Sequence, residues 1–384
     1  MKTALTYDDI QLVPAFSNIK SRQNIKLHTL LSERYGLLNP IVASPMDTVC
    51  EFEMAYKMAM MGGVGCIHRF MSIGEQADIV KRLNTAIYHE TIVEPSIAEA
   101  WGVMYDDWHA EMRAVPIMAA IGVQDEDKDR AMALVDAGAN VLLIDVAHGD
   151  HQNVLDMIHW CVTQDDFQHV DIIAGNIATA EAAKFLCKLG VDIVKVGIGP
   201  GSICTTRLVA GIGVPQLSAL LDAKKGLSKN VKMISDGGVK FSGDIAKALA
   251  AGADAVMVGS MIAGTNEAPG KIIKKNGKLF KVFRGMGSVG AMNKGSADRY
   301  FQKKQKDSSK YVPEGVEGLI KYKGDVSKII FKLIGGLKSS MGYLGSKNVI
   351  NLRNKPKFVK ITKAGFYESM VHSIDEVKKN SQYL

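Results

Sequence analysis

Cysteine is scarce in this chain, and the cysteines that are present are poorly placed to pair. Their number is odd and no Cys-x-x-Cys spacing occurs, so both a disulfide framework and a zinc cluster are disfavoured. The same pattern is typical of proteins from a reducing compartment. The five cysteines are Cys50, Cys66, Cys161, Cys187 and Cys204.

Long apolar runs are also missing. No stretch of the 384 residues approaches the length of a membrane-spanning helix, and residues 1–9 lack the apolar core of a secretory signal. We therefore expect a cytoplasmic protein without a membrane anchor.

Positive charge exceeds negative charge only moderately, with a net charge of +7. This surplus favours an anionic ligand such as a nucleotide, or it reflects a lysine-rich surface, since much of it follows residue 270. The chain has no basic stripe interleaved with aromatic residues, so we expect no dedicated nucleic-acid binding.

The sequence does contain a regular alternation of short apolar runs with amphipathic stretches. Apolar strands alternating with helices predict a parallel sheet covered on both faces, and eight such units predict an α/β fold of the (β/α)8 TIM-barrel type. The eight candidate strands are 40–44, 64–68, 116–120, 141–145, 171–175, 193–197, 232–236 and 255–259. The candidate helices are 52–61, 74–88, 126–137, 151–163, 179–189, 216–225 and 241–251.

Three segments break this alternation. Residues 89–114 are too long for an ordinary connection, and residues 265–325 are rich in glycine and lysine with weak periodicity. Long irregular segments of this kind are usually lids, binding loops or disordered chain. Residues 345–384 look like an extension outside the barrel, so we expect one barrel domain over 1–384 with these three additions.

Glycine-rich sequence follows three of the late strands, at the end of the barrel where functional residues collect. The run 197–206 follows the sixth strand, and its backbone N–H groups can cradle a phosphate, although glycine also makes tight turns. The runs 236–238 and 259–260 follow strands seven and eight, where barrels commonly hold phosphate. Together the three runs predict a phosphate site.

Cys204 lies inside the run 197–206, beside hydroxyl groups and near Arg207. A free cysteine is most often a small buried apolar residue, and this suits the other four cysteines, which lie in or beside apolar patterns. At Cys204, loop dipoles and a nearby cation would instead favour the reactive thiolate. We therefore predict that Cys204 is a catalytic nucleophile.

Asp145 and Asn176 end the fourth and fifth strands. They either cap the helices that follow or bind a ligand such as a ribose diol or a nicotinamide amide. His148 is a possible base, but a lone histidine is more often structural.

Several long motifs together resemble the inosine-5'-monophosphate dehydrogenase family. They are GIGPGSICTTR at 197–207, SPMDTV at 44–49, AGNIATA at 174–180, SDGG at 235–238 and RGMGS at 284–288. The resemblance runs from about Leu5 to Ser369 and implies an NAD-dependent oxidoreductase of guanine nucleotide biosynthesis. In that family the residue matching Cys204 attacks C2 of IMP, a hydride passes to NAD, and the covalent thioimidate is hydrolysed to XMP.

The resemblance also implies a role for each motif residue. Asp236 matches the carboxylate on the ribose hydroxyls, and Thr206 lies beside the thiol as a catalytic residue. The residues implied to bind IMP are Ser44, Met46, Ser202, Asp236, Gly238, Gly259, Ser260, Gly285, Met286, Gly287 and Glu314. Those implied to bind NAD are Asp145, Asn176, Gly197 and Gly199.

Segments 298–302 and 312–318 resemble the mobile flap of the family, which folds into the vacated NAD site. Arg299 and Tyr300 would then activate the hydrolytic water. Family members are also homotetramers that use potassium, held by loop carbonyls and by a C-terminal segment of a neighbouring subunit. The matching residues here are Gly199, Gly201, Cys204, Glu368, Ser369 and Met370.

This chain departs from the usual family pattern in three places. Met370 stands where bacterial members have histidine. Phe283 stands where other members have a tyrosine that directs its hydroxyl to the phosphate. Because Phe283 lacks this hydroxyl, we expect somewhat weaker IMP binding. The paired CBS modules that usually follow the second barrel helix have no counterpart except residues 89–114. We therefore expect no allosteric control through such modules.

Three other functions compete with this interpretation. A GMP reductase, which converts GMP to IMP with NADPH, shares the barrel and the cysteine loop, but it has no use for the flap around Arg299 and Glu314. A flavin-dependent barrel oxidoreductase could use the phosphate site, but it leaves Cys204 without a role. A non-catalytic nucleotide-binding protein would not need an intact set of Cys204, Asp236 and Arg299.

Overall fold

A computed structural model of the chain describes residues 2–89, 115–354, 356–371 and 373. Most of the segment predicted to replace the CBS modules, residues 90–114, lies outside the described residues.

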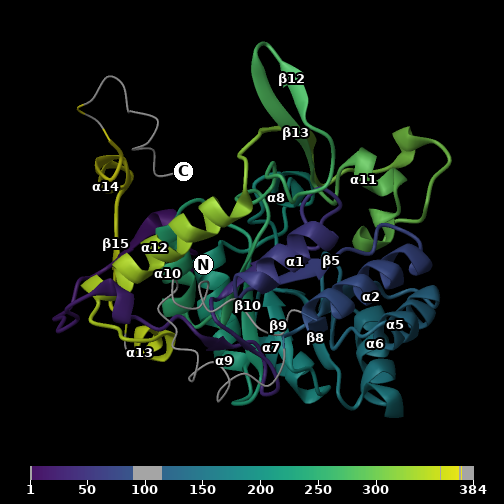
Figure 1. Ribbon diagram of the computed structural model, residues 1–384, viewed down its shortest axis with the longest axis horizontal. Helices are drawn as coiled ribbons and strands as arrows, with labels where there is room; N and C mark the ends of the chain where they lie inside the picture. Colours follow the sequence, from purple (N-terminus) through teal and green to yellow (C-terminus); the bar gives the residue numbers. More distant parts are fainter. Residues whose placement is uncertain (1, 90–114, 355, 372, 374–384) are drawn as a thin grey trace.

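Eight parallel strands close into a barrel in the order β10-β11-β4-β5-β6-β7-β8-β9 (Figure 1). Nearly all of their residues are buried, because helices cover the outer face and side chains fill the interior. The predicted (β/α)8 barrel is confirmed, with each strand within a few residues of its expected position. The strands are β4 (Ile41–Ala43), β5 (Val64–Ile67), β6 (Met118–Ile121), β7 (Val141–Asp145), β8 (Asp171–Ile177), β9 (Ile193–Val196), β10 (Lys232–Asp236) and β11 (Ala255–Val258).

All seven predicted helices surround this barrel. They are α1 (Phe52–Met60), α2 (Ile73–His89), α5 (Glu126–Asp136), α6 (Gln152–Val162), α7 (Ala180–Lys188), α9 (Gln216–Gly226) and α10 (Ser242–Ala251). A further long helix, α12 (Val326–Tyr343), was not predicted. It buries Ile330, Leu333 and Leu337 and packs beside α10, so it takes the place of the eighth barrel helix.

Polar side chains at the start of alternate strands form hydrogen bonds to the preceding strand, at the amino-terminal end of the barrel. Asn140, Asp192 and Asp254 each accept the backbone N–H of a residue at the start of the preceding strand, at 2.8 Å in every case. The hairpin of β2 (Thr29–Leu30) and β3 (Gly36–Leu37) covers the same end, where its apolar residues join the interior of the barrel. The opposite end, at the carboxyl termini of the strands, is left for the site.

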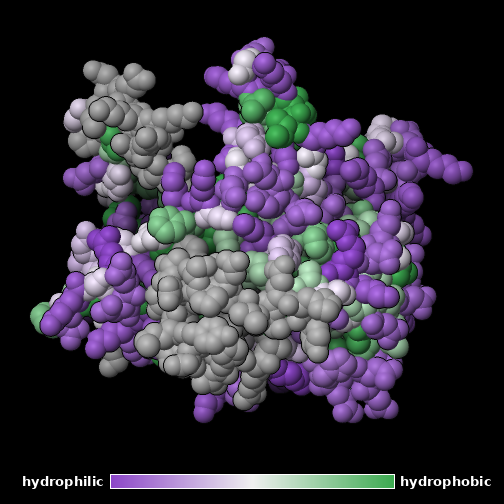
Figure 2. Space-filling view, viewed as in Figure 1, coloured by the Kyte–Doolittle hydropathy of each residue, from purple (hydrophilic) through white to green (hydrophobic). Residues whose placement is uncertain are grey.

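The irregular region after β11 forms a small antiparallel sheet and a flap. β12 (Ile273–Lys275), β13 (Lys278–Arg284) and β14 (Glu317–Lys321) pair in order, and the β12–β13 hairpin projects from the barrel (Figure 1). Figure 2 shows apolar residues gathered on this hairpin. The flap between β13 and β14 contains α11 (Val289–Asn293) and the 3₁₀ helices η4 (Ser296–Tyr300) and η5 (Ser308–Lys310).

The two terminal segments meet beside the barrel. β1 (Ile10–Leu12) pairs antiparallel with β15 (Phe358–Lys360).

No helix in the described part of the chain is long and apolar enough to cross a membrane. The remaining elements are η1 (Tyr7–Asp9), η2 (Arg22–Asn24), η3 (Asp165–Phe167), α8 (Thr206–Val209), α13 (Val349–Arg353) and α14 (Lys363–Glu368).

Candidate active site

A cavity of about 200 Å³ lies at the mouth of the barrel, between the strand ends and the flap. Every residue predicted above to act in catalysis, or to bind the substrate or NAD, lines this cavity. The residues come from six strand ends and from the flap, so the closure of the barrel gathers positions that are far apart in the sequence.

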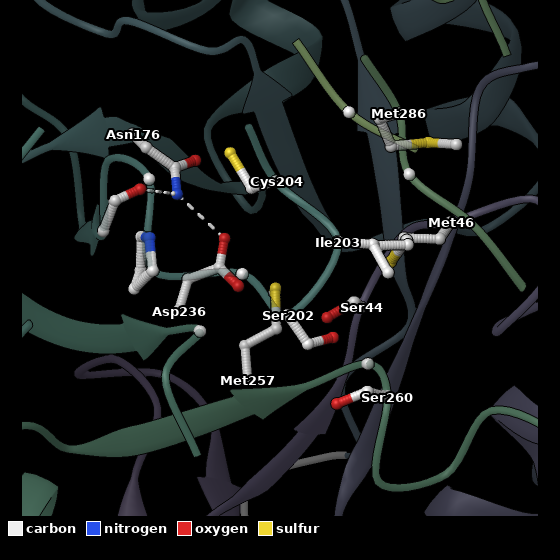
Figure 3. Close-up of a pocket in the computed structure, with 18 of the residues that line it drawn as sticks. Ser44, Met46, Asn176, Ser202, Ile203, Cys204, Asp236, Met257, Ser260 and Met286 are labelled. Carbon is white, nitrogen blue, oxygen red and sulfur yellow. Dashed lines mark hydrogen bonds between the residues drawn. The ribbon is translucent and has the colours of Figure 1, made fainter. Parts of the chain in front are cut away.

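Cys204 follows β9 in a loop that is joined to the flap. The Cys204 thiol donates a hydrogen bond to the Thr206 hydroxyl at 3.2 Å, and Figure 3 shows it directed toward Asn176. The Thr205 N–H donates to the Glu314 carbonyl at 2.9 Å. The thiol is partly exposed to the cavity, whereas Cys50, Cys66 and Cys161 are buried and burial raises their pKa values.

The path of the Cys204 loop depends on a glycine and an arginine. Gly197 has φ +153°, and a Cβ there would lie 2.1 Å from the Asp236 carbonyl oxygen, so no larger residue fits. The Arg207 guanidinium donates to the carbonyls of Val214 at 2.6 Å and Ile198 at 3.4 Å. Arg207 therefore supports the loop through its backbone, and these hydrogen bonds do not involve the thiol.

Lys195 is a charged residue of the site that the sequence analysis missed. It lies in β9, is 1% exposed, and donates to Asp145 at 2.8 Å, Asn176 at 2.5 Å and Asp236 at 3.1 Å. Burial opposes its charge, but the two carboxylates raise the pKa of Lys195 above its ordinary value. The signal that was overlooked is a single lysine within the otherwise apolar strand Ile193–Val196.

Asn176 is held fully within this network. Its side-chain amide donates to the Gly197 carbonyl at 2.7 Å and to Asp236 at 2.8 Å, while its oxygen accepts from Lys195 (Figure 3). Asn176 therefore orients the Asp236 carboxylate and the Cys204 loop at the same time, and it does not cap a helix.

Arg299 of the flap forms a two-pronged ion pair with Asp145. Its Nε and Nη2 atoms donate to the two carboxylate oxygens at 2.8 and 3.0 Å, and its carbonyl accepts the Ala147 N–H at 2.9 Å. Although burial opposes ionisation, Arg299 and Lys195 hold the pKa of Asp145 below its usual range. Asp145 in turn raises the pKa of Arg299 above its ordinary value against the effect of burial, so Arg299 is charged in this arrangement.

Tyr300 lies beside this ion pair. Its hydroxyl accepts a long hydrogen bond from Arg299 at 3.4 Å, and burial raises the pKa of Tyr300 to about 12. Both catalytic candidates of the flap therefore carry their protons at neutral pH while Arg299 contacts Asp145.

The other end of the cavity is lined by hydroxyl groups. Ser44, Ser202 and Ser260 direct their oxygens toward the same region, where a phosphate was predicted (Figure 3). Phe283 also lines the cavity, and it offers no hydroxyl.

Lys323, just after β14, lies against the turn that carries Ser260. It donates to the backbone carbonyls of Ser260 at 2.5 Å and Met261 at 2.9 Å. Burial lowers the pKa of Lys323 to about 8. This ammonium group was not predicted, and it places a positive charge against the turn that carries Ser260.

The predicted potassium ligands are not brought together within one chain. Gly199, Gly201 and Cys204 lie in the cavity loop, where the Gly201 carbonyl also accepts the Cys204 N–H at 3.1 Å. The segment 368–370 lies beside the terminal strands, and Ser369 accepts a hydrogen bond from Gln11 at 3.5 Å. Figure 1 shows α14, next to this segment, well separated from α8.

Comparison with known proteins decides the family of this barrel. The family model described as the IMP dehydrogenase / GMP reductase domain matches residues 4–372. The chain belongs to this family. It is therefore an oxidoreductase, as the motifs predicted.

Relatives in the family have similar or greater length. Inosine-5'-monophosphate dehydrogenase of Cryptosporidium parvum is 41% identical over 396 aligned positions, covering 99% of this chain and 97% of that protein. The enzyme of the same name from Borreliella burgdorferi is 40% identical, covering 97% and 98%. The alignment with the Aquifex aeolicus enzyme, 36% identical, extends over 486 positions and covers 100% of this chain and 98% of that one.

The fold also resembles a solved structure of a GMP reductase. GMP reductase of Trypanosoma brucei, solved as a variant in complex with guanosine 5'-monophosphate, superposes with a TM-score of 0.84. It is 35% identical, and the match covers 97% of this chain and 98% of that one.

Proposed function

We propose that the protein oxidises IMP to XMP with reduction of NAD, in guanine nucleotide biosynthesis. The single observation that carries this proposal is the Arg299–Asp145 ion pair at 2.8 Å, which places the flap in the cavity that Cys204 lines. A dehydrogenase needs a hydrolytic group at that position, whereas a reductase does not.

Each end of the cavity suits one part of the substrate. Ser202, Gly238, Gly259, Ser260 and Gly285 would bind the phosphate, and Asp236, held by Asn176 and Lys195, would accept hydrogen bonds from the ribose hydroxyls. The base would lie among Met286, Gly287 and Glu314, with Ser44 and Met46 opposite. This arrangement would present C2 of the base to the Cys204 thiol.

The nicotinamide side of the cavity contains groups that suit a carboxamide. Asp145 and the Gly197 carbonyl are acceptors, and Asn176 and Gly199 lie beside them in the cavity lining. When NAD is bound it accepts the hydride that leaves C2. In this structure Arg299 of the flap is paired with Asp145. The flap would therefore have to leave this site before the nicotinamide binds there, and return after it dissociates.

The reaction then requires two changes at C2. The Cys204 thiolate adds to C2 and the hydride leaves, which produces a covalent thioimidate with the substrate. A water molecule then adds to C2 and releases a proton to solvent, and the C–S bond breaks to release XMP and the thiolate. Since Asp145 keeps Arg299 charged, its guanidinium orients the water and stabilises the developing negative charge in the arrangement observed.

The alternative is GMP reductase activity, because the solved relative reported above carries that name. One assay separates the two. With IMP and NAD in potassium buffer, we expect formation of reduced nicotinamide and XMP. GMP-dependent oxidation of NADPH, without any signal from IMP and NAD, would show that the protein is a reductase.

Lys323 should contribute to IMP binding through its charge. Replacing it with methionine is expected to raise the KM for IMP about tenfold with little change in kcat, since the charge-assisted hydrogen bonds that hold the Ser260 turn are lost. Because the lysine loses its proton as the pH rises through about 8, the wild-type KM should also rise between pH 7 and 9. Steady-state rates across this range, with Lys323→Arg as the conservative control, test both points. An unchanged KM in Lys323→Met would exclude this role.

Potassium and a homotetramer complete the proposal. One chain offers only the loop carbonyls of Gly199, Gly201 and Cys204, so Glu368, Ser369 and Met370 would have to come from a second copy. Exposed apolar residues near the Cys204 loop and on the β12–β13 hairpin would become buried in such an assembly. They include Leu208 at 86% exposure and Ile212 at 60%. We also propose that the protein acts in the cytoplasm.

A further inference from the structure

The two catalytic candidates of the flap are flanked in sequence by two residues that anchor it to the barrel. Arg299 and Tyr300 lie between Asp298 and Phe301, at the end of η4. Asp298 and Phe301 do not line the cavity. Their partners belong to two different connections at the barrel mouth, so the catalytic pair is held from both sides.

The first anchor is an ion pair between Asp298 and Arg69, which follows β5. The guanidinium donates two hydrogen bonds to the carboxylate, from Nη1 to Oδ2 at 2.8 Å and from Nη2 to Oδ1 at 3.2 Å. The Arg69 side chain is 5% exposed and the Asp298 side chain 22% exposed, so most of the pair is shielded from solvent. Two-pronged pairs of this kind restrict orientation as well as distance.

Arg69 is held in place by the barrel. A Cβ at position 122 would lie 3.0 Å from the Arg69 guanidinium carbon and 2.4 Å from an Asp127 oxygen, so Gly122 provides the space that the arginine occupies. The guanidinium also lies 5.2 Å from the centre of the Phe70 ring. The barrel therefore positions the Arg69 guanidinium, and Asp298 is the residue of the flap that binds to it.

The second anchor is the stacking of Phe301 on His151. The two rings lie 3.9 Å apart with an angle of 18° between their planes. Phe301 has φ +56°, a left-handed conformation that is unfavourable for a side chain of this size and needs compensation from its contacts. His151 is the N-cap residue of α6 and accepts the Asn153 N–H at 3.2 Å, so it too is fixed by the barrel.

We propose that the Arg69–Asp298 and His151–Phe301 contacts form a latch that sets how often the flap is closed. The latch residues are positioning residues, because they act on the reaction through Arg299 and Tyr300. This inference rests on the proposed function. A weaker latch lowers the population of the closed state, which slows hydrolysis of the covalent adduct but leaves the hydride step, which needs the flap out of the site, unaffected.

Asp298→Asn tests the latch, because it removes the charge and preserves the shape. Rapid mixing with IMP and NAD should show a burst of about one reduced nicotinamide per active site at the wild-type rate, followed by turnover slowed about tenfold. Intact-protein mass spectrometry should show the adduct accumulating on Cys204. Asp307→Asn, the same change at an exposed position of the flap, should behave as the wild type within about twofold.

Two further variants separate positioning from general damage to the fold. Arg69→Gln should reproduce the effect of Asp298→Asn, and the double variant should be no slower than either single one, since both remove the same contact. Arg69→Lys should restore part of the rate. A parallel loss of burst rate and turnover in Asp298→Asn, or unchanged turnover, would overturn the proposal.

Hydrogen exchange tests the latch independently of the reaction. The Ala147 N–H, outside the flap, donates to the Arg299 carbonyl at 2.9 Å, so it should exchange when the flap opens. In ligand-free Asp298→Asn, exchange in the peptide containing Ala147 should be about tenfold faster than in the wild type. Faster exchange in a protein that does not oxidise IMP would support the latch and reject the proposed function. Unchanged exchange would reject the latch whatever the reaction.

Discussion

Replacing Cys204 with alanine is expected to abolish IMP oxidation. Without the thiolate no bond forms at C2, so the carbon cannot release a hydride, and kcat should fall by at least about 10⁴-fold, the scale of loss when an enzyme is deprived of its covalent nucleophile. The phosphate and ribose contacts do not involve the thiol, so the dissociation constant for IMP should change by less than about threefold. Absorbance of reduced nicotinamide and calorimetric titration with IMP measure the two quantities.

Cys187→Ala provides the matched control for this prediction. Cys187 lies in α7, is only partly buried and does not line the cavity, so its loss should leave kcat and KM unchanged. Residual turnover of Cys204→Ala at one hundredth of the wild-type rate or faster would mean that the reaction does not proceed through this cysteine.

Replacing Arg299 with alanine is expected to separate the two halves of the reaction. The variant should still transfer the hydride, because Arg299 occupies the nicotinamide side only when the flap is closed. Hydrolysis should slow by about 10²- to 10³-fold, the usual cost of losing a group that stabilises charge in the transition state. Rapid mixing should show a burst of reduced nicotinamide equal to the enzyme concentration, and mass spectrometry should detect the adduct on Cys204.

Lys303→Ala removes a cation from the same flap without removing a contact of the site, because Lys303 is exposed. It should turn over at the wild-type rate, with the same time course of reduced nicotinamide as the wild type. If Arg299→Ala also turned over normally, the flap would have no hydrolytic role, and the reductase alternative would gain support.

The barrel was predictable because most of its strands and helices have a recognisable local sequence pattern. Every strand is a short apolar run, and seven of the helices have the periodicity that buries one face. Helix α12 has such a face as well, but the antiparallel sheet and the flap separate it from β11, and this interrupted the repeating order that identified the others. Its place was decided by packing against α10, which the closed barrel positions.

The sequence by itself determined the barrel, the loop that carries Cys204 and the motifs of the phosphate end, because these depend on residue type at neighbouring positions. The tertiary structure decided the electrostatics of the site. Lys195 joins Asp145, Asn176 and Asp236 only when four strands come together, and Arg299 meets Asp145 across 154 positions of chain. Charge on a buried group depends on its partners in space, and the spacing of residues along a chain carries no information about partners that far apart.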